Sequence, residues 1–168
     1  MSFKNVINHK FYTTITSPLG EIYLASDGEH ITGLWFEKQK YFPESIFDVK
    51  KATELDIFEE ASRWLDLYFS GQNPDFFPGI KPQGTDFRHK VWDVLLQIPY
   101  GSVRTYGDIA KELGVNSAQA VGGAVGHNPI SILIPCHRVV GTNGSLTGFA
   151  GGVDKKSWLL ENERGASC

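Results

Sequence analysis

Ile134-Pro135-Cys136-His137-Arg138-Val139-Val140 places one of the chain's two cysteines beside a histidine, inside an apolar run that begins at Ile130. A free cysteine in such a run can be an inert buried thiol. Pro135 cannot donate a backbone hydrogen bond, which favours an irregular or edge position over a central strand. Neighbouring side chains of a regular strand point to opposite faces, so Cys136 and His137 can cooperate only if the chain bends. The pattern predicts a bend at Pro135 and leaves both a structural and a reactive thiol open.

Six ordered blocks surround this segment between residues 85 and 163. They are FRHKVW (87–92), IPYG (98–101), TYG (105–107), AVGGA (120–124), GFAGG (148–152) and WLLENE (158–163). With Asn128-Pro129 and PCHRV (135–139), they resemble the O6-alkylguanine-DNA alkyltransferases, also called methylated-DNA–protein-cysteine methyltransferases. The segment 135–139 is similar to the active-site signature of that family. The N-terminal half of the chain resembles the family only loosely.

The N-terminal half shows strand and turn signals followed by one helical pattern. Residues 11–16, 21–26 and 30–36 are rich in aromatic and β-branched side chains and are separated by short turn sequences at 17–20 and 27–28. Such runs predict a three-stranded antiparallel meander. Apolar residues then recur at helical spacing over 54–69.

The expected fold is α/β of the α+β kind. Residues 1–84 form a small antiparallel sheet with a helix and end in a Pro- and Gly-rich linker at 72–84. Residues 85–168 form a mostly helical domain, which begins with a helix that Asp86 can cap and that ends before Pro99. Residues 105–113 and a second helix running to Gly126, joined through Gly114 with Asn116 or Ser117 as cap, have helix-turn-helix form.

The second of these helices has small side chains. They are Ala118, Ala120, Gly122, Gly123, Ala124 and Gly126. Each helical glycine costs roughly 1 kcal/mol relative to alanine, so the helix needs close approach to another surface. A neighbouring helix would satisfy that need, and so would the minor groove of DNA, which is only about 6 Å wide.

The family resemblance implies DNA as the partner of this helix. It implies a minor-groove helix-turn-helix with contacts from Ser117, Ala118, Gln119, Ala120, Gly122 and Gly123. Gln119 occupies the position where the family usually carries an arginine that replaces the extruded base in the stack. Glutamine lacks the charge and the planar guanidinium of arginine, so we expect weaker DNA binding.

The resemblance also implies the chemistry. The substrate would be double-stranded DNA carrying O6-alkylguanine, with the damaged nucleotide flipped out of the stack. Cys136 would attack the alkyl carbon as a thiolate, and His137 would take the thiol proton through a water. Glu163 would orient the histidine in the manner of a triad, although a glutamate near a terminus is otherwise a solvated residue. Tyr106 would donate a hydrogen bond to the purine, and Asn128 would tie the recognition helix to the cysteine segment.

The pocket for the flipped base is also implied by the resemblance. Backbone groups near Cys136 and Val139 and the amide of Ala150 would read the base, and the segment 148–152, with Phe149, would form a flexible wall. The thioether product has no route back to a thiol, so the protein would act once. We expect no cofactor, because no segment of the sequence resembles a cofactor site. We also expect no Cys/His zinc site, because the N-terminal half has His9 and His30 but no cysteine.

Composition limits the cellular setting without indicating DNA. The net charge of the 168 residues is −3, with 8 Lys and Arg against 12 Asp and Glu in residues 1–84 and 8 against 7 in residues 85–168. No apolar run approaches the roughly 18 residues that a membrane span needs, and the N-terminus lacks the features of a secretion signal. Two cysteines, one of them Cys168, do not make a disulfide framework. We expect a cytoplasmic monomer that does not bind membranes.

Three alternatives stay open. A relative could bind alkylated DNA without transfer, although loss of the cysteine would be its signature and Cys136 is present. A thiol hydrolase could use the Cys-His pair, but it would need an oxyanion site. A transcriptional regulator would leave the segment 135–139 unexplained.

Overall fold

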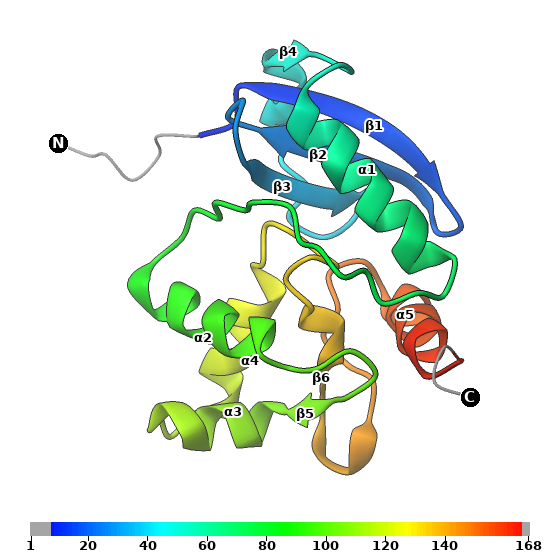
Figure 1. Cartoon of the computed structure of the whole chain (residues 1–168). Coiled ribbons are helices and arrows are strands. Elements are labelled where there is room, and N and C mark those ends of the chain that lie inside the picture. The colour runs from blue at the N-terminus through cyan, green and yellow to red at the C-terminus, as the bar shows by residue number, and fades with distance from the viewer. Residues whose placement is uncertain (1–7, 166–168) are drawn as a thin grey trace, which may run out of the picture.

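The computed structural model describes residues 8–165, in which a sheet with one helix lies against a helical second half (Figure 1). Strands β1 (Phe11–Ser17), β2 (Gly20–Ser26) and β3 (Ile31–Phe36) pair as consecutive antiparallel neighbours. Gly20 and Gly28 in the two turns have φ of 99° and 107°, which glycine adopts without a Cβ penalty. The predicted meander is confirmed.

A short strand that we did not predict widens the sheet. After the 3-10 helix η1 (Glu44–Asp48), β4 (Lys50–Lys51) pairs parallel to β1, which gives the order β3-β2-β1-β4. The sheet is therefore mixed rather than purely antiparallel. Two residues carry no usable periodicity, so the sequence held no signal for β4.

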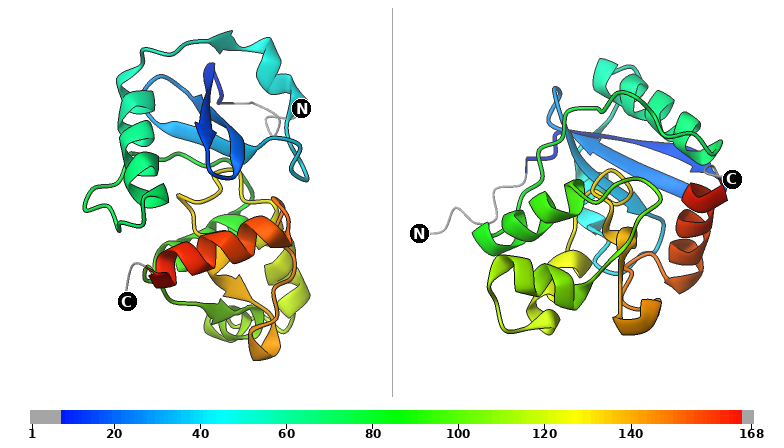
Figure 2. Two further views of the ribbon diagram at one scale, coloured as in Figure 1. Left: turned by 90° about the vertical axis from the view of Figure 1, so that its right-hand side faces the viewer. Right: turned by 60° about the horizontal axis from the view of Figure 1, so that its bottom comes forward.

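Helix α1 (Asp56–Phe69) covers one face of the sheet (Figures 1 and 2). Its buried residues follow the predicted helical spacing and are Ile57, Phe58, Ala61, Trp64, Leu65 and Tyr68. One buried apolar cluster runs from this helix and the sheet into the second half, where it includes Trp92, Leu95 and Ile134. The segment 72–84 belongs to this packing, because Ile31 accepts a hydrogen bond from Lys81 N–H (2.9 Å) and donates one to the Gly79 carbonyl (2.8 Å).

Helix α2 (Asp86–Leu96) opens the second half. Its cap is Thr85, whose hydroxyl accepts from Arg88 N–H, and not Asp86 as we predicted. A threonine hydroxyl at the cap reaches the free N–H groups of the first turn, whereas Asp86 is already inside the helix. Regular helix ends at Leu96, before Pro99.

The predicted helix-turn-helix consists of α3 (Tyr106–Leu113) and α4 (Ala118–Gly126). Thr105 caps α3 through a reciprocal box with Asp108, Gly114 ends α3 at φ 69°, and Ser117 caps α4. The Trp92 indole N–H donates to the Ala124 carbonyl (2.9 Å) and holds α4 against α2.

The remaining chain joins the active-site segment to the last helix. The 3-10 turn η2 (Cys136–Arg138) leads into β6 (Val139–Val140), which pairs parallel to β5 (Arg104–Thr105). After η3 (Thr142–Gly144), α5 (Val153–Gly165) lies beside the end of α1 (Figures 1 and 2). No helix within residues 8–165 combines the length and the apolar character that spanning a bilayer requires.

Candidate active site

The predicted bend at Pro135 is present. Pro135 has φ −78° and ψ 64°, and the three residues after it form the turn η2 rather than a strand. Upstream, Ile132 has φ 69°, a conformation that costs a β-branched residue on the order of 1–3 kcal/mol. The surrounding core holds it there, because Ile132 is only 1% exposed. This turn lets the adjacent side chains of Cys136 and His137, both buried, serve one site.

Helix α5 brings Glu163 to the histidine. Oε2 of Glu163 lies 2.6 Å from Nε2 of His137, and both side chains are fully buried. Hydrogen bonds from His137 and Arg138 lower the pKa of Glu163 to about 2 despite its burial, so the carboxylate is ionised and can only accept. Nε2 of His137 therefore carries the proton, and Nδ1 presents its lone pair. Burial lowers the pKa of His137, which keeps the ring neutral at neutral pH.

Arg138 and the backbone complete the setting of this carboxylate. Arg138 donates from Nε to Oε1 (2.9 Å) and from Nη2 to Oε2 (3.1 Å), while its Nη1 donates to the Ile98 carbonyl (2.8 Å). Gly101 N–H donates to Oε1 at 3.0 Å. A buried charge needs this number of partners to offset its loss of water. Arg138 thus contacts the carboxylate and a backbone carbonyl, which is a structural set of partners.

The thiol of Cys136 is protonated at rest. Burial raises its pKa, against smaller lowering effects from hydrogen bonding by Asn128 and from the charge of Lys156. Asn128 itself donates to the Ile134 carbonyl (2.8 Å) and accepts from Ile130 N–H (2.9 Å). The chain just after α4 is thereby fixed to the turn that leads into the cysteine.

Tyr106 and Lys156 share one acceptor. The Tyr106 hydroxyl donates to the Thr147 carbonyl at 3.0 Å, and Nζ of Lys156 donates to the same oxygen at 2.8 Å. Lys156 is completely buried, which lowers its pKa to about 8. A negative charge on Cys136 raises the pKa of both side chains, so the thiolate would be stabilised by the Lys156 cation.

The outer face of α4 meets the predicted pocket wall. A pocket of about 280 Å³ is lined by Gly122, Gly123, Gly126, His127, Gly148, Phe149 and Ala150, and by Lys40 and Tyr41 from the sheet half. Lys40 N–H donates to the Ala150 carbonyl (3.0 Å), and the Tyr41 ring stacks on His127 with centroids 4.1 Å apart. Of the three residues predicted to surround the flipped base, Phe149 and Ala150 line this pocket, whereas Val139 is buried in β6 and does not. Cys136, 4% exposed, is not in the lining.

The first turn of α4 is exposed. Ser117, Ala118, Gln119 and Ala120 all face outward, together with Gly123. An added Cβ would meet the Tyr106 ring at 3.9 Å from Gly122, but would meet nothing within 4 Å from Gly123 or Gly126. Of these three glycines, only Gly122 therefore has another side chain of the described protein packed close to it, and Gly123 and Gly126 face open space.

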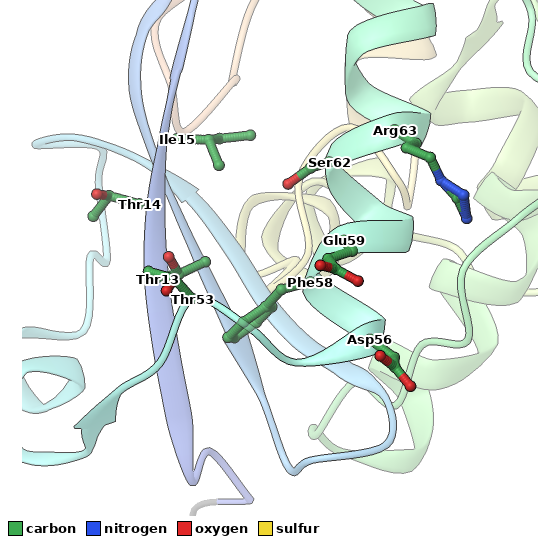
Figure 3. Close-up of a pocket in the computed structure, with 9 residues that line it drawn as sticks. All are labelled: Thr13, Thr14, Ile15, Thr53, Asp56, Phe58, Glu59, Ser62 and Arg63. Atoms are coloured by element: carbon green, nitrogen blue, oxygen red, sulfur yellow. The ribbon is translucent and has the colours of Figure 1, made fainter.

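Another hollow, of about 730 Å³, lies between β1 and α1 on the sheet half (Figure 3). Its lining includes Thr13, Asp56, Glu59 and Arg63 but none of the predicted site residues. In residues 8–165, no three His, Cys, Asp or Glu side chains gather as metal ligands would. Cys168 lies outside the described residues.

Comparison with known proteins gives the family. The model described as the DNA binding domain of 6-O-methylguanine DNA methyltransferase matches residues 86–165, and the model of the ribonuclease-like domain of the same proteins matches residues 10–77. The chain belongs to the 6-O-methylguanine DNA methyltransferase family. The resemblance of the active-site segment is confirmed, and it extends to the N-terminal half, which the sequence alone matched only loosely.

Relatives in the methyltransferase family match almost the whole chain. The methylated-DNA–protein-cysteine methyltransferase of Haemophilus influenzae is 43% identical over 157 residues, covering 92% of this chain and 86% of that protein. The one from Methanosarcina acetivorans is 44% identical over 162 residues, covering 94% and 99%. The crystal structure of Mycobacterium tuberculosis O6-methylguanine methyltransferase has a TM-score of 0.85 at 43% identity and covers 93% of each chain. A structure of M. tuberculosis OGT in complex with DNA has a TM-score of 0.85 at 41% identity, covering 93% and 94%.

Sequence reasoning missed two buried polar residues of this methyltransferase site. Lys156 had a signal, because it shares one face of α5 with Leu159, Leu160 and Glu163 at positions i, i+3, i+4 and i+7. A lysine and a glutamate on an apolar helical face indicate buried, paired charges. Tyr68 had no such signal, since it fits the apolar pattern of α1 and its hydroxyl partner is 95 residues away.

Proposed function

We propose that this member of the family repairs DNA by moving an alkyl group from O6 of guanine in duplex DNA to Sγ of Cys136. Each molecule, acting as a monomer, performs the transfer once. The observation that carries the proposal is the buried His137–Glu163 pair (2.6 Å) directly beside Cys136. Nδ1 of that histidine is buried and has no hydrogen-bond partner within residues 8–165. A buried polar atom of this kind is suited to a proton received through a bridging water.

The reaction balances within these groups. Nδ1 of His137 receives the thiol proton through a water, and Glu163 stabilises the imidazolium that forms. The thiolate forms the S–C bond as the C–O6 bond breaks, and the electron pair of that bond stays on guanine. Tyr106, freed from Thr147, donates a hydrogen bond to the purine, and the proton from the thiol finally resides on guanine. Asn128 keeps the cysteine segment attached to the DNA-contacting helix.

The exposed turn of α4 supports binding in the minor groove. Small side chains at Ala118 and Ala120 and open space beside Gly123 let a groove wall approach the helix. The flipped base enters between α4 and the segment 148–152, where Phe149 and Ala150 line the pocket. Gln119 occupies the gap that the base leaves in the stack.

Mass spectrometry after incubation with a duplex containing O6-methylguanine tests the proposal. We expect one methyl group of added mass on Cys136, stoichiometric with protein, absent in Cys136→Ser and retained in Cys168→Ser. A protein that holds the DNA without a mass change would be a binding relative. A protein that neither gains the mass nor holds the DNA would favour the thiol hydrolase instead.

A further inference from the structure

Helix α1 of the sheet half carries a tyrosine that reaches the catalytic carboxylate. The Tyr68 hydroxyl donates to Oε2 of Glu163 at 2.6 Å, the same oxygen that accepts from Nε2 of His137 at 2.6 Å. It also lies 3.4 Å from Nε2 itself. Tyr68 is completely buried, so no water competes for its proton.

The position of this hydroxyl is fixed from both sides. The Tyr68 ring stacks on Trp64 with centroids 5.3 Å apart and an interplanar angle of 8°, and it meets the His137 ring edge-on at 6.4 Å. Across the interface, the Asn162 amide donates to the Tyr68 carbonyl at 2.9 Å and fixes α5 to the end of α1. Burial and the charge of Glu163 raise the pKa of Tyr68 far above its ordinary value, so the hydroxyl keeps its proton and acts as a donor.

We propose that Tyr68 is a positioning residue for alkyl transfer, through which the sheet half holds the Glu163 carboxylate in line with His137. This inference rests on the proposed function. Without the tyrosine, Oε2 would keep the donors Nε2 of His137 and Nη2 of Arg138, both from the segment that contains Cys136. The carboxylate would keep its hydrogen bond to Nε2 of His137 but would lose its attachment to α1.

Loss of this hydrogen bond has a second consequence. A hydrogen bond donated to a carboxylate draws negative charge away from it. In Tyr68→Phe, Glu163 would present more negative charge to His137, which raises the pKa of the imidazole above its value in the wild type. A side chain that only fills space at the interface between the halves would have no such effect on the titration of His137.

The test compares Tyr68→Phe with Tyr100→Phe. The Tyr100 hydroxyl is buried beside Tyr68, with ring centroids 6.2 Å apart, and has no hydrogen-bond partner in the described part of the chain. Its removal controls for the loss of a buried hydroxyl in the same cluster. For each protein, the single-turnover rate of methyl transfer to Cys136 is measured at saturating O6-methylguanine duplex from acid to neutral pH. The titration of the His137 ring nitrogens in the free protein is followed by NMR.

In Tyr68→Phe we expect transfer to be about tenfold slower at mildly acid pH, the scale of one hydrogen bond to an ionised group. In the plot of transfer rate against pH, we expect the rise on the acid side to move to higher pH, together with the titration of His137. Tyr100→Phe should follow the wild type in both measurements. If the acid side of the pH–rate profile and the His137 titration both stay at their wild-type positions, the inference is overturned, whatever the transfer rate at neutral pH. If the wild type itself transfers no methyl group, the proposed function fails, but the NMR comparison still decides whether Tyr68 acts on His137.

Discussion

The charge of Glu163 can be removed with almost no change in side-chain shape. Glu163→Gln keeps the side-chain volume but gives Arg138 and His137 a neutral amide in place of a carboxylate. The pKa of Glu163 is lowered from 4.5 to about 2 by these two partners. A shift of that size corresponds to roughly 3 kcal/mol of folding free energy, which is the expected loss of stability in the variant at neutral pH.

The pH dependence of this loss has a definite sign. A carboxyl group whose pKa is depressed by folding stabilises the folded state above its unfolded pKa, and the contribution disappears as the pH falls towards the folded pKa. The wild type therefore loses the contribution of Glu163 between pH 4.5 and about 2. Glu163→Gln has nothing to lose in that window, so the two unfolding free energies converge on acidification.

Urea denaturation at a series of pH values measures this convergence. Glu161→Gln is the matched control, because Glu161 lies on the same helix and is exposed. Substitution of an exposed carboxylate should change stability by less than about 0.5 kcal/mol. A gap between wild type and Glu163→Gln that stays constant down to acid pH would refute the electrostatic argument, and so would a neutral-pH loss no larger than that of Glu161→Gln.

Three further substitutions test other parts of the site. Gln119→Arg should bind duplex DNA more tightly and steepen the dependence of log affinity on log salt concentration by about 0.9. Fluorescence anisotropy measures both, and an unchanged slope would contradict a phosphate or groove contact at this position. Asn128→Ala removes the acceptor of Ile130 N–H and one of two donors to the Ile134 carbonyl, which keeps its bond from Cys136 N–H. It should lower the unfolding free energy by about 1–3 kcal/mol in urea, whereas a loss below about 0.5 kcal/mol would show that the segment relaxes. Lys156→Met removes a buried charge and should change stability by less than about 1 kcal/mol, yet slow transfer about tenfold because the thiolate loses a nearby cation. An unchanged single-turnover rate would exclude that electrostatic role.

Local chemistry made much of the fold predictable. The turns at Gly20 and Gly28 and the stop at Gly114 each depend on neighbours in the sequence, and the structure has them where the sequence placed them. Of the two caps that the sequence offered for α4, Asn116 and Ser117, the structure uses Ser117. The pairing of β4 with β1 depends on a contact across some forty residues of chain, which no local pattern encodes. The division into domains at residue 84 stays a prediction.

The candidate site was less accessible to the same reasoning. Periodicity alone gives Cys136 as one more buried apolar residue, and only the family resemblance singled out Glu163 and Tyr106 in advance. The convergence of Tyr68 with His137 and Glu163 requires the relative placement of α1, η2 and α5, which are distant in sequence. Side chains that act through the tertiary structure leave no local signature when, like Tyr68, they also satisfy the packing pattern.

The resting protonation states fit a nucleophile that acts once. A free thiolate would react with any electrophile, and each unproductive reaction would spend a molecule of protein. Burial raises the pKa of Cys136, so the thiol is protected until a base removes its proton. Burial also keeps His137 neutral, and the ionised Glu163 directs the free lone pair to Nδ1. In the proposed mechanism the proton leaves the sulfur through His137, and the buried position of Cys136 limits that event to a substrate that reaches the thiol.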